Sequence, residues 1–214
     1  MKKTLISIKS KFNFFFKKIN NFSSNYSEAL PIYLDNKGLG LKVHLGSGEI
    51  NLQGWINIDA RKFKHTHIVD QDFELKEFTD ESISEIYLCH VLEHFSFEDS
   101  LKLLEKLNKK LSKGSVIRIS VPDFSKLKMI YDETSNLEQI KYAIMGGQNY
   151  ENDFHKSIYD FKILSELLNK ANFKDVIVWN SKKDFGIELN DWSNGAYNVN
   201  NKKIKISLNV KAIK

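Results

Sequence analysis

The chain has 214 residues, of which 42% are hydrophobic and 28% charged, and this composition suits one globular domain and excludes a collagen-like or wholly disordered chain. The formal net charge is +5, but residues 1–22 contain six lysines and no acid, so the remainder carries 5 − 6 = −1. Arginine, the residue best suited to clamp phosphates and to read guanine, occurs only at Arg61 and Arg118. A nucleic-acid-binding protein is therefore disfavoured.

The single cysteine, Cys89, excludes an internal disulfide and a zinc site built from cysteines, and it fits a reducing cytoplasm. No apolar run approaches the roughly 20 residues that would span a bilayer. The N-terminus lacks the unbroken apolar segment and the small-residue cleavage site of a signal peptide. We therefore expect a cytoplasmic protein, either soluble or peripheral at the inner face of the membrane.

Residues 1–22, MKKTLISIKSKFNFFFKKINNF, place apolar residues at steps of three and four and lysines between them. This spacing predicts a basic amphipathic helix. Its apolar face could pack on the domain or on a second copy of the chain, which is the favoured interpretation, or lie among the headgroups of an anionic membrane. Residues 23–40 predict a linker, so we divide the chain into a helix with its linker, 1–40, and a main domain, 41–214.

The main domain alternates short apolar runs with helical patterns. One helix is expected over 96–114, where Ser96 and Asp99 resemble a capping box and Gly114 would end the helix, and a second over 160–173. The last segment, 203–213, alternates strictly and predicts one strand near a sheet edge. This order predicts an α/β fold, a mostly parallel sheet with helices on both faces and a late antiparallel strand. The other expected strands are residues 41–45, 56–59, 66–70, 85–89, 116–121 and 175–179.

The first strand ends in a loop with two glycines, Gly46 and Gly48, and the second strand ends at Asp59. Glycine lets a ligand approach the backbone, and an acid in this position can accept hydrogen bonds from ribose hydroxyls. The loop lacks the third glycine of the dinucleotide fingerprint and the Gly-Lys-Ser/Thr ending of a phosphate-binding loop. The pattern therefore predicts a nucleoside ligand without phosphates.

Four segments then occur in order: VHLGSGEINLQGWINIDA, DQDFELKEFTDESISEIYLCHVLEHF, LSKGSVIRISVPDF and GGQNYENDFHKSIYDFKILSELLNKANF. Together they resemble the S-adenosylmethionine-dependent class I methyltransferases, in particular a small bacterial type found among surface-polysaccharide genes. The resemblance covers roughly residues 41–180, and it departs from the general class between Gly48 and Trp55, which leave no room for a full helix. It implies a Rossmann-like fold with a mostly parallel seven-stranded sheet and an antiparallel C-terminal strand.

The resemblance also implies the cofactor, S-adenosyl-L-methionine, and residues that hold it. Gly46, Ser47 and Gly48 would line its methionine end, and Asp59 would bind the ribose. These four residues follow or end the first two strands.

Later residues would contact the rest of the cofactor. Asp72 and Phe73 would bracket the adenine, although Asp72 could equally be a solvated acid. Cys89 and His90, which end the fourth strand, would border the sulfonium. Cys89 is more typical of a small core residue than of a nucleophile.

Methyl transfer requires an acceptor in line with the methyl group, and a base only if that acceptor is a hydroxyl or a protonated amine. His155 is the candidate base, with Asp153 as the residue that orients it, although both could simply fix their loop through backbone hydrogen bonds. Candidate acceptor-binding residues are His94, Gln148, Tyr150 and Asp123, and Asp123 could instead cap a helix.

The stretch CHVLEHF places His90 and His94 four residues apart with Glu93 between them. This spacing resembles a pair of metal ligands, but an obvious third ligand is missing, so no metal is expected. His65 and His67 fall in a lysine-rich loop and are expected to be solvated.

We therefore expect a methyltransferase that acts on a sugar, a sugar phosphate or a related precursor of a cell-surface glycan, with O-methylation favoured over N-methylation. The glycan assignment depends on the resemblance alone. One alternative is a catalytically silent protein that binds S-adenosylmethionine and acts as an adaptor at a membrane or a partner protein. Another, a nucleotide-dependent sugar-modifying enzyme such as an oxidoreductase, is opposed by the missing third glycine. The oligomeric state is left open.

Overall fold

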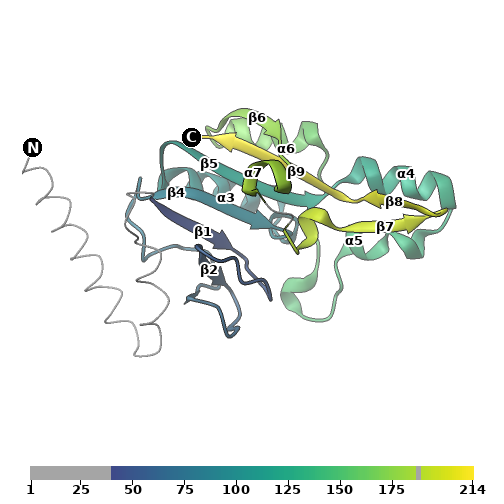
Figure 1. Cartoon of the computed structure of the whole chain (residues 1–214), viewed down its shortest axis with the longest axis horizontal. Coiled ribbons are helices and arrows are strands. Elements are labelled where there is room, and N and C mark those ends of the chain that lie inside the picture. Colours follow the sequence, from purple (N-terminus) through teal and green to yellow (C-terminus); the bar gives the residue numbers. More distant parts are fainter. Residues whose placement is uncertain (1–39, 187–188) are drawn as a thin grey trace, which may run out of the picture.

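The structure is a computed structural model that describes residues 40–186 and 189–214, so the helix expected over 1–22 and nearly all of its linker lie outside the described residues. Its main sheet has seven strands in the order β3-β2-β1-β4-β5-β9-β6. In Figure 1 the sheet extends from β2 and β1, low in the view, to β6 at the top. The strands are β1 Leu41–Leu45, β2 Ile56–Asp59, β3 Ile68–Val69, β4 Ile83–Cys89, β5 Leu111–Pro122, β6 Lys174–Val178 and β9 Ser207–Ile213.

Strands β1 to β5 pair in parallel, whereas β9 runs antiparallel to both of its neighbours, β5 and β6. The late antiparallel strand is therefore confirmed, and β9 lies near the sheet edge as expected, since only β6 lies beyond it. The expected single strand over 203–213 is divided, however, because buried Ile206 separates β9 from β8, Lys202–Lys205. The Ile206 amide donates to the Gly195 carbonyl, and its own carbonyl accepts from the Asp123 amide. Strand β8 pairs instead with β7, Ala196–Val199.

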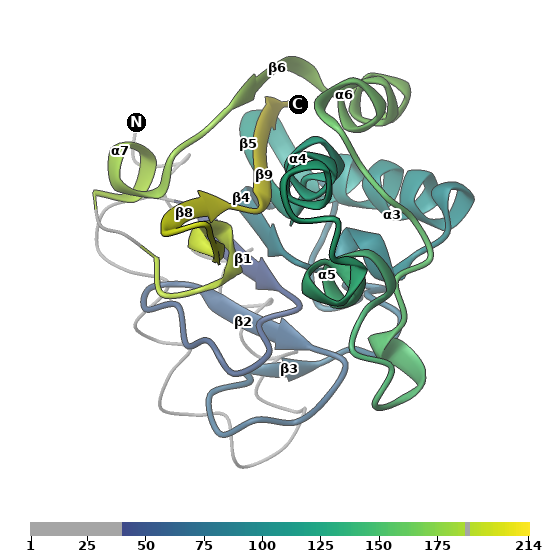
Figure 2. The same cartoon turned by 90° about the vertical axis from the view of Figure 1, so that its right-hand side faces the viewer.

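Helices cover both faces of the sheet: in Figure 2, α3 and α6 lie on one side and α7 on the other. Ser96 caps α3 by accepting a hydrogen bond from the Asp99 amide, as its sequence predicts. The helix ends at Lys110, not at Gly114, because Leu111 is already buried in β5 opposite Ile83. The α-helices are α3 Phe97–Lys110, α4 Phe124–Thr134, α5 Lys141–Met145, α6 Phe161–Lys170 and α7 Ser181–Phe185.

Among the described residues, three clusters of buried side chains hold these layers together. The largest lies between the sheet and the helices α3 and α6. A second joins α4 and α5 to the β7–β8 hairpin, which lies beyond the carboxyl end of β5 in Figure 1. In the third, the ring of Tyr87 packs against Trp55, Trp179 and Phe185 on the face that α7 covers. The last two clusters fix the segments beyond the carboxyl ends of the strands, where a parallel sheet binds its ligands.

Candidate functional site

A cavity of about 1450 Å³ opens at the carboxyl ends of β1, β2 and β4. Its walls come from the loops after these strands, from α3, from the segment 142–156 and from the segment 189–206. Ten of the sequence-predicted residues other than the candidate catalytic pair line it: Gly46, Ser47, Gly48, Asp59, Asp72, Phe73, Cys89, His90, His94 and Tyr150. Asp153 and His155 line it as well.

The glycine loop after β1 has an open side toward this cavity. Gly46 and Gly48 have φ values of +69° and +52°, a region that other residues enter at a cost. A Cβ on Gly46 would lie 2.3 Å from Val91 Cγ2, whereas a Cβ on Gly48 would meet nothing within 4 Å. Between them, the buried Ser47 hydroxyl has no hydrogen-bond partner among the described residues. The loop thus offers bare backbone and an unsatisfied hydroxyl to a ligand.

Asp59 is 6% exposed and joins β2 to the glycine loop. One carboxylate oxygen accepts a hydrogen bond from the Gly48 amide at 2.7 Å, and the other accepts from the Arg61 amide at 2.8 Å. These two bonds fix the carboxylate at the cavity wall, and each oxygen retains a lone pair for a further donor.

Two histidines expected to be solvated instead support this region. His65 Nε2 lies 3.0 Å from the Gly48 carbonyl oxygen, and a carbonyl only accepts, so the ring donates this bond. His67 is buried, and its Nδ1 accepts from the Asn57 amide at 2.9 Å. The expectation was wrong because the loop after β2 folds back onto its own strand.

Asp72 and Phe73 lie together on the wall that follows β3. Phe73 is buried with φ +49°, and its ring centroid lies 6.2 Å from that of Phe95. The turn is held by the Asp70 carboxylate, which accepts hydrogen bonds from the Glu74 and Leu75 amides. The Asp72 side chain remains exposed at the cavity.

Cys89 and His90 end β4 beside each other. Burial raises the pKa of the Cys89 thiol, which therefore stays protonated and is a poor nucleophile at neutral pH. His90 has φ +54°, and its Nε2 lies 2.9 Å from the Ser207 hydroxyl. Its Nδ1 lies 3.2 Å from a carboxylate oxygen of Glu93, so both ring nitrogens have polar neighbours.

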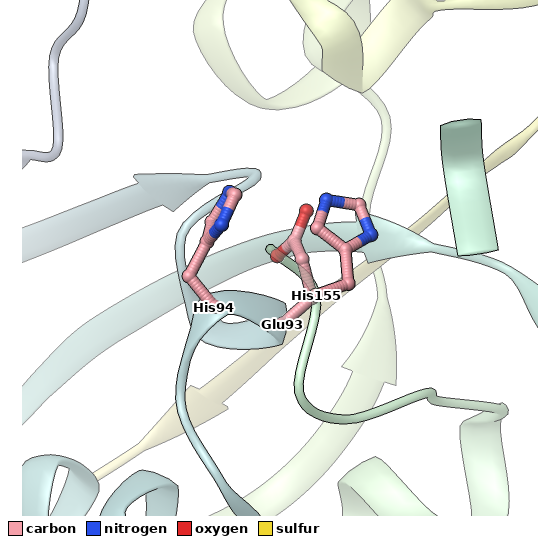
Figure 3. Close-up of side chains that lie close together, drawn as sticks. All are labelled: Glu93, His94 and His155. Carbon is pink, nitrogen blue, oxygen red and sulfur yellow. The ribbon is translucent and has the colours of Figure 1, made fainter. Parts of the chain in front are cut away.

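Glu93, His94 and His155 form one cluster beside the cavity, and Figure 3 shows the Glu93 carboxylate between the two rings. One ligand atom from each residue lies within 4.8 Å of the others, so these residues could hold a metal ion. Glu93 is only 1% exposed. Burial alone would raise the pKa of its carboxyl, but the neighbouring imidazoles, His90 foremost, lower that pKa and favour the carboxylate.

The expected pairing of Asp153 with His155 is wrong. The Asp153 carboxylate accepts hydrogen bonds from the backbone and side-chain amides of Asn149, at 3.0 and 2.9 Å. His155 Nδ1 instead lies 3.1 Å from the Ala143 carbonyl oxygen, to which it donates. Burial lowers the pKa of His155, so its ring is neutral near pH 7 and Nε2 carries a lone pair.

Two of the expected acceptor-binding residues lie outside the lining of the cavity. Asp123 caps α4 by accepting from the Ser125 amide at 3.0 Å, which is the alternative that its sequence left open. Gln148 is exposed with φ +58°, and its side chain donates to the Met145 carbonyl. Tyr150 does line the cavity, and its ring stacks on the Arg61 guanidinium at 4.7 Å.

The wall built from residues 189–195 and the β7–β8 hairpin was not predicted from the sequence. Here Asp191 accepts a hydrogen bond from the buried Tyr87 hydroxyl at 2.7 Å, and Trp192 lies 5.9 Å from the His90 ring with 55% of its surface exposed. The sequence did contain a signal, because the adjacent asparagines Asn200 and Asn201, which adopt positive φ in the two-residue turn between β7 and β8, are residues that tolerate this conformation. Two such residues between alternating runs are typical of a hairpin turn.

Comparisons with solved structures identify the fold. A SAM-dependent methyltransferase from Archaeoglobus fulgidus matches with a TM-score of 0.52 at 16% identity, over 86% of this chain and 89% of that one. A chain from the complex of the Haloferax volcanii Trm112 methyltransferase activator with a methyltransferase matches with a TM-score of 0.50 at 11% identity, over 92% and 93%. A possible exported protein from Bordetella parapertussis matches with a TM-score of 0.52 at 11% identity, over 82% of this chain and 62% of that one.

No protein-family model matches the chain, and no curated protein sequence matches it. The structural matches, together with the strand order and the antiparallel β9, show the Rossmann-like class I methyltransferase fold that the sequence predicted. The β7–β8 hairpin is an addition to the predicted sheet. Of the described helices, none is both long and apolar enough to cross a membrane.

Proposed function

We propose that the protein is an S-adenosylmethionine-dependent methyltransferase. The observation that supports this most directly is the continuity of the cavity, which runs along the glycine loop and reaches Asp59 at the end of the neighbouring strand. A Cβ on Gly48 would project into open space there, and the Ser47 hydroxyl has no partner among the described residues. These features fit a nucleoside with a small 5′ substituent.

In this proposal, each part of the cofactor would contact a different group of residues that line the cavity. Gly46 and Gly48 would lie along its methionine end, Asp59 would accept hydrogen bonds from the ribose hydroxyls, and Phe73 would pack on the adenine. When bound, S-adenosylmethionine supplies a methyl group on a positively charged sulfur. The remaining task of the protein is to hold an acceptor atom in line with that methyl group.

The acceptor is proposed to lie between Trp192 and the pair His94 and His155, which line the same cavity. A half-exposed indole offers an apolar surface to the C–H face of a sugar ring. A neutral imidazole with a free Nε2 suits an acceptor that must lose a proton, so a hydroxyl of a sugar or a sugar phosphate is favoured. His155 would then receive that proton.

The first experiment is a titration of the purified full-length chain with S-adenosylhomocysteine, NAD and NADP by calorimetry. Binding of S-adenosylhomocysteine alone is expected, since the loop lacks the groups that hold a pyrophosphate. Binding of a dinucleotide alone would refute the proposal. A screen of nucleotide sugars and phosphorylated sugars, with the demethylated cofactor present, would then identify the acceptor by its thermal shift.

The second candidate is a silent adaptor that binds the cofactor without turnover. The same purified chain can distinguish it from an enzyme in a methyl-transfer assay. It predicts cofactor binding but no methyl transfer to any member of a broad acceptor panel. The exposed Trp192 and the half-buried rings of His94 and His155, which line the cavity, favour an enzyme, because an adaptor would have no need to keep these groups accessible. A peripheral position on the inner membrane face is likewise a proposal, which co-sedimentation of the full chain with anionic vesicles would test.

A further inference from the structure

His94 and His155 present their rings to the Glu93 carboxylate in the same chemical form. His94 Nδ1 lies 3.3 Å from the Phe154 carbonyl oxygen, and His155 Nδ1 lies 3.1 Å from the Ala143 carbonyl oxygen. A carbonyl oxygen only accepts hydrogen bonds, so in both rings Nδ1 carries the proton and Nε2 has the lone pair. This is the arrangement of metal-binding histidines, in which a backbone carbonyl fixes the tautomer and orients the ring.

Glu93 supplies the negative charge, and its close polar neighbour His90 Nδ1 leaves at least one carboxylate oxygen without a donor among the described residues. Both of its carboxylate oxygens are buried without a hydrogen bond among the described residues, although His90 Nδ1 lies 3.2 Å from one of them. An ionised carboxylate removed from water is costly unless a cation or donors satisfy it. In Figure 3 its oxygens point into the space between His94 and His155.

We propose that Glu93, His94 and His155 bind one divalent transition-metal ion, of which Zn²⁺ is the best-suited example. Two imidazoles and one carboxylate are a common catalytic ligand set for zinc, with a further coordination position left open. Donors at about 2.0 to 2.1 Å from such an ion lie roughly 3.3 Å apart in a tetrahedral site. The observed limit of 4.8 Å therefore requires the side chains to close by about 1.5 Å at most, which rotation about χ angles can supply.

The surroundings match this assignment. His90 lies between the Glu93 carboxylate and the Ser207 hydroxyl, so it can hold the carboxylate in place from behind. Glu93 itself is absent from the lining of the cavity, whereas His94 and His155 line it. The open coordination position of the ion would therefore lie on the side of the two histidines and face the cavity. No local sequence pattern indicated this third ligand, because His155 lies on a loop far from Glu93 and His94 in the chain.

The ion would also define what the acceptor must carry, and this part of the inference rests on the proposed function. An oxygen bound to a divalent ion loses its proton more readily than a free hydroxyl. The acceptor hydroxyl would bind at the open position and release its proton to solvent, and the O–H bond is the only bond broken in this step. His155 would then be a ligand and would not take the proton itself. The acceptor class is therefore a hydroxyl compound able to bind a metal through oxygen.

The test is a calorimetric titration of the tag-free, full-length chain with Zn²⁺, and an absorption titration with Co²⁺, whose visible spectrum reports the number and type of ligands. One ion per chain is expected, with a Co²⁺ spectrum typical of mixed nitrogen and oxygen donors. Mg²⁺ is expected to bind poorly, because it prefers oxygen ligands in octahedral geometry.

Substitutions assign the ligands. Glu93→Gln, His94→Ala and His155→Ala are each expected to weaken Zn²⁺ binding more than about 100-fold, and His90→Ala by about 10- to 100-fold, the usual effect of losing a residue that supports a ligand. Glu98→Gln is the matched control, because this carboxylate is 79% exposed and lies outside the cavity lining, and it should leave binding unchanged. Thermal unfolding identifies any variant that fails to fold, and the half-buried His94 is the ligand most safely replaced.

Two outcomes would overturn the metal site. One is no Zn²⁺ or Co²⁺ binding by the wild type, which would leave His155 as a direct proton acceptor. The other is equal binding by the wild type and by folded His94→Ala and Glu93→Gln variants. Neither outcome touches the proposed function, which is tested separately by S-adenosylhomocysteine binding and by methyl transfer to the acceptor panel.

Discussion

The most informative substitution is Gly48→Ala, because it separates backbone strain from occupation of the cavity. Gly48 has φ +52°, so an alanine at this position would adopt a left-handed backbone conformation, which costs about 1 to 2 kcal/mol of folding free energy. Its added methyl group meets no protein atom within 4 Å and projects into open space. The free energy of unfolding should therefore fall only by the strain. In a domain of this length that loss lowers the melting temperature by about 2 to 8 °C.

Cofactor affinity should fall much more than the strain alone explains. The methyl group occupies space that the proposed ligand needs next to the loop, and displacing the ligand by even a few tenths of an ångström weakens its contacts with Asp59. We expect the affinity for S-adenosylhomocysteine to fall at least about tenfold, which corresponds to about 1.4 kcal/mol. Calorimetry at a temperature well below the melting temperature measures this directly.

Gly114→Ala is the matched control. Gly114 has φ +75° in the irregular start of β5, and a Cβ there also meets nothing within 4 Å, but the residue does not line the cavity. It should lose similar stability and retain full affinity. If Gly48→Ala binds S-adenosylhomocysteine as tightly as Gly114→Ala does, the ligand does not lie against the glycine loop and the reasoning fails.

Three further predictions follow from the polar groups of the site. Asp59→Ala should weaken S-adenosylhomocysteine binding by about 1 to 3 kcal/mol in calorimetry, and unchanged affinity would remove Asp59 from the site. His155→Ala should slow methyl transfer by about 10² to 10⁴ while the cofactor still binds, so normal turnover would leave His155 a structural role only. Burial lowers the pKa of His44 to about 4, from an unfolded value near 6.5, so the folded chain binds fewer protons between these two values. The stability from this group is fully present above pH 6.5, and about 3 kcal/mol of it is lost as the pH falls toward 4. Urea unfolding at pH 7 and pH 4 should show that His44→Gln loses less stability than the wild type, and equal losses would contradict the assignment.

The order of elements was readable from the sequence because each signal is local. The runs at 41–45 and 56–59 match β1 and β2 residue for residue. Such short apolar runs, bounded by glycine and polar turns, are too short for a helix and are typical of buried strands. Ser96 starts α3 through a hydrogen bond to a residue three positions away. The two glycines and Asp59 could be assigned to one site because the carboxyl ends of neighbouring parallel strands meet at the same sheet edge.

Local sequence signals failed to predict the secondary structure where a segment was compatible with more than one arrangement. Leu111 fits the apolar stripe of a helix as well as it fits a strand, and only its pairing with Ile83 decides that β5 begins there. The strictly alternating segment 203–213 could have formed one strand, but the Gly195 and Asp123 backbones hold Ile206 between two separate sheets.

The sequence by itself therefore determined the class of fold and the end of the strands at which the cavity of the candidate site lies. Which side chains meet was decided only by tertiary structure. His155 takes its orientation from the Ala143 carbonyl and lies beside Glu93, whereas Asp153, two residues away in the chain, faces Asn149. The physical reason is that a histidine or a carboxylate can satisfy its hydrogen bonds with many partners. Its choice depends on which backbone and side-chain groups the packed core brings within about 3 Å.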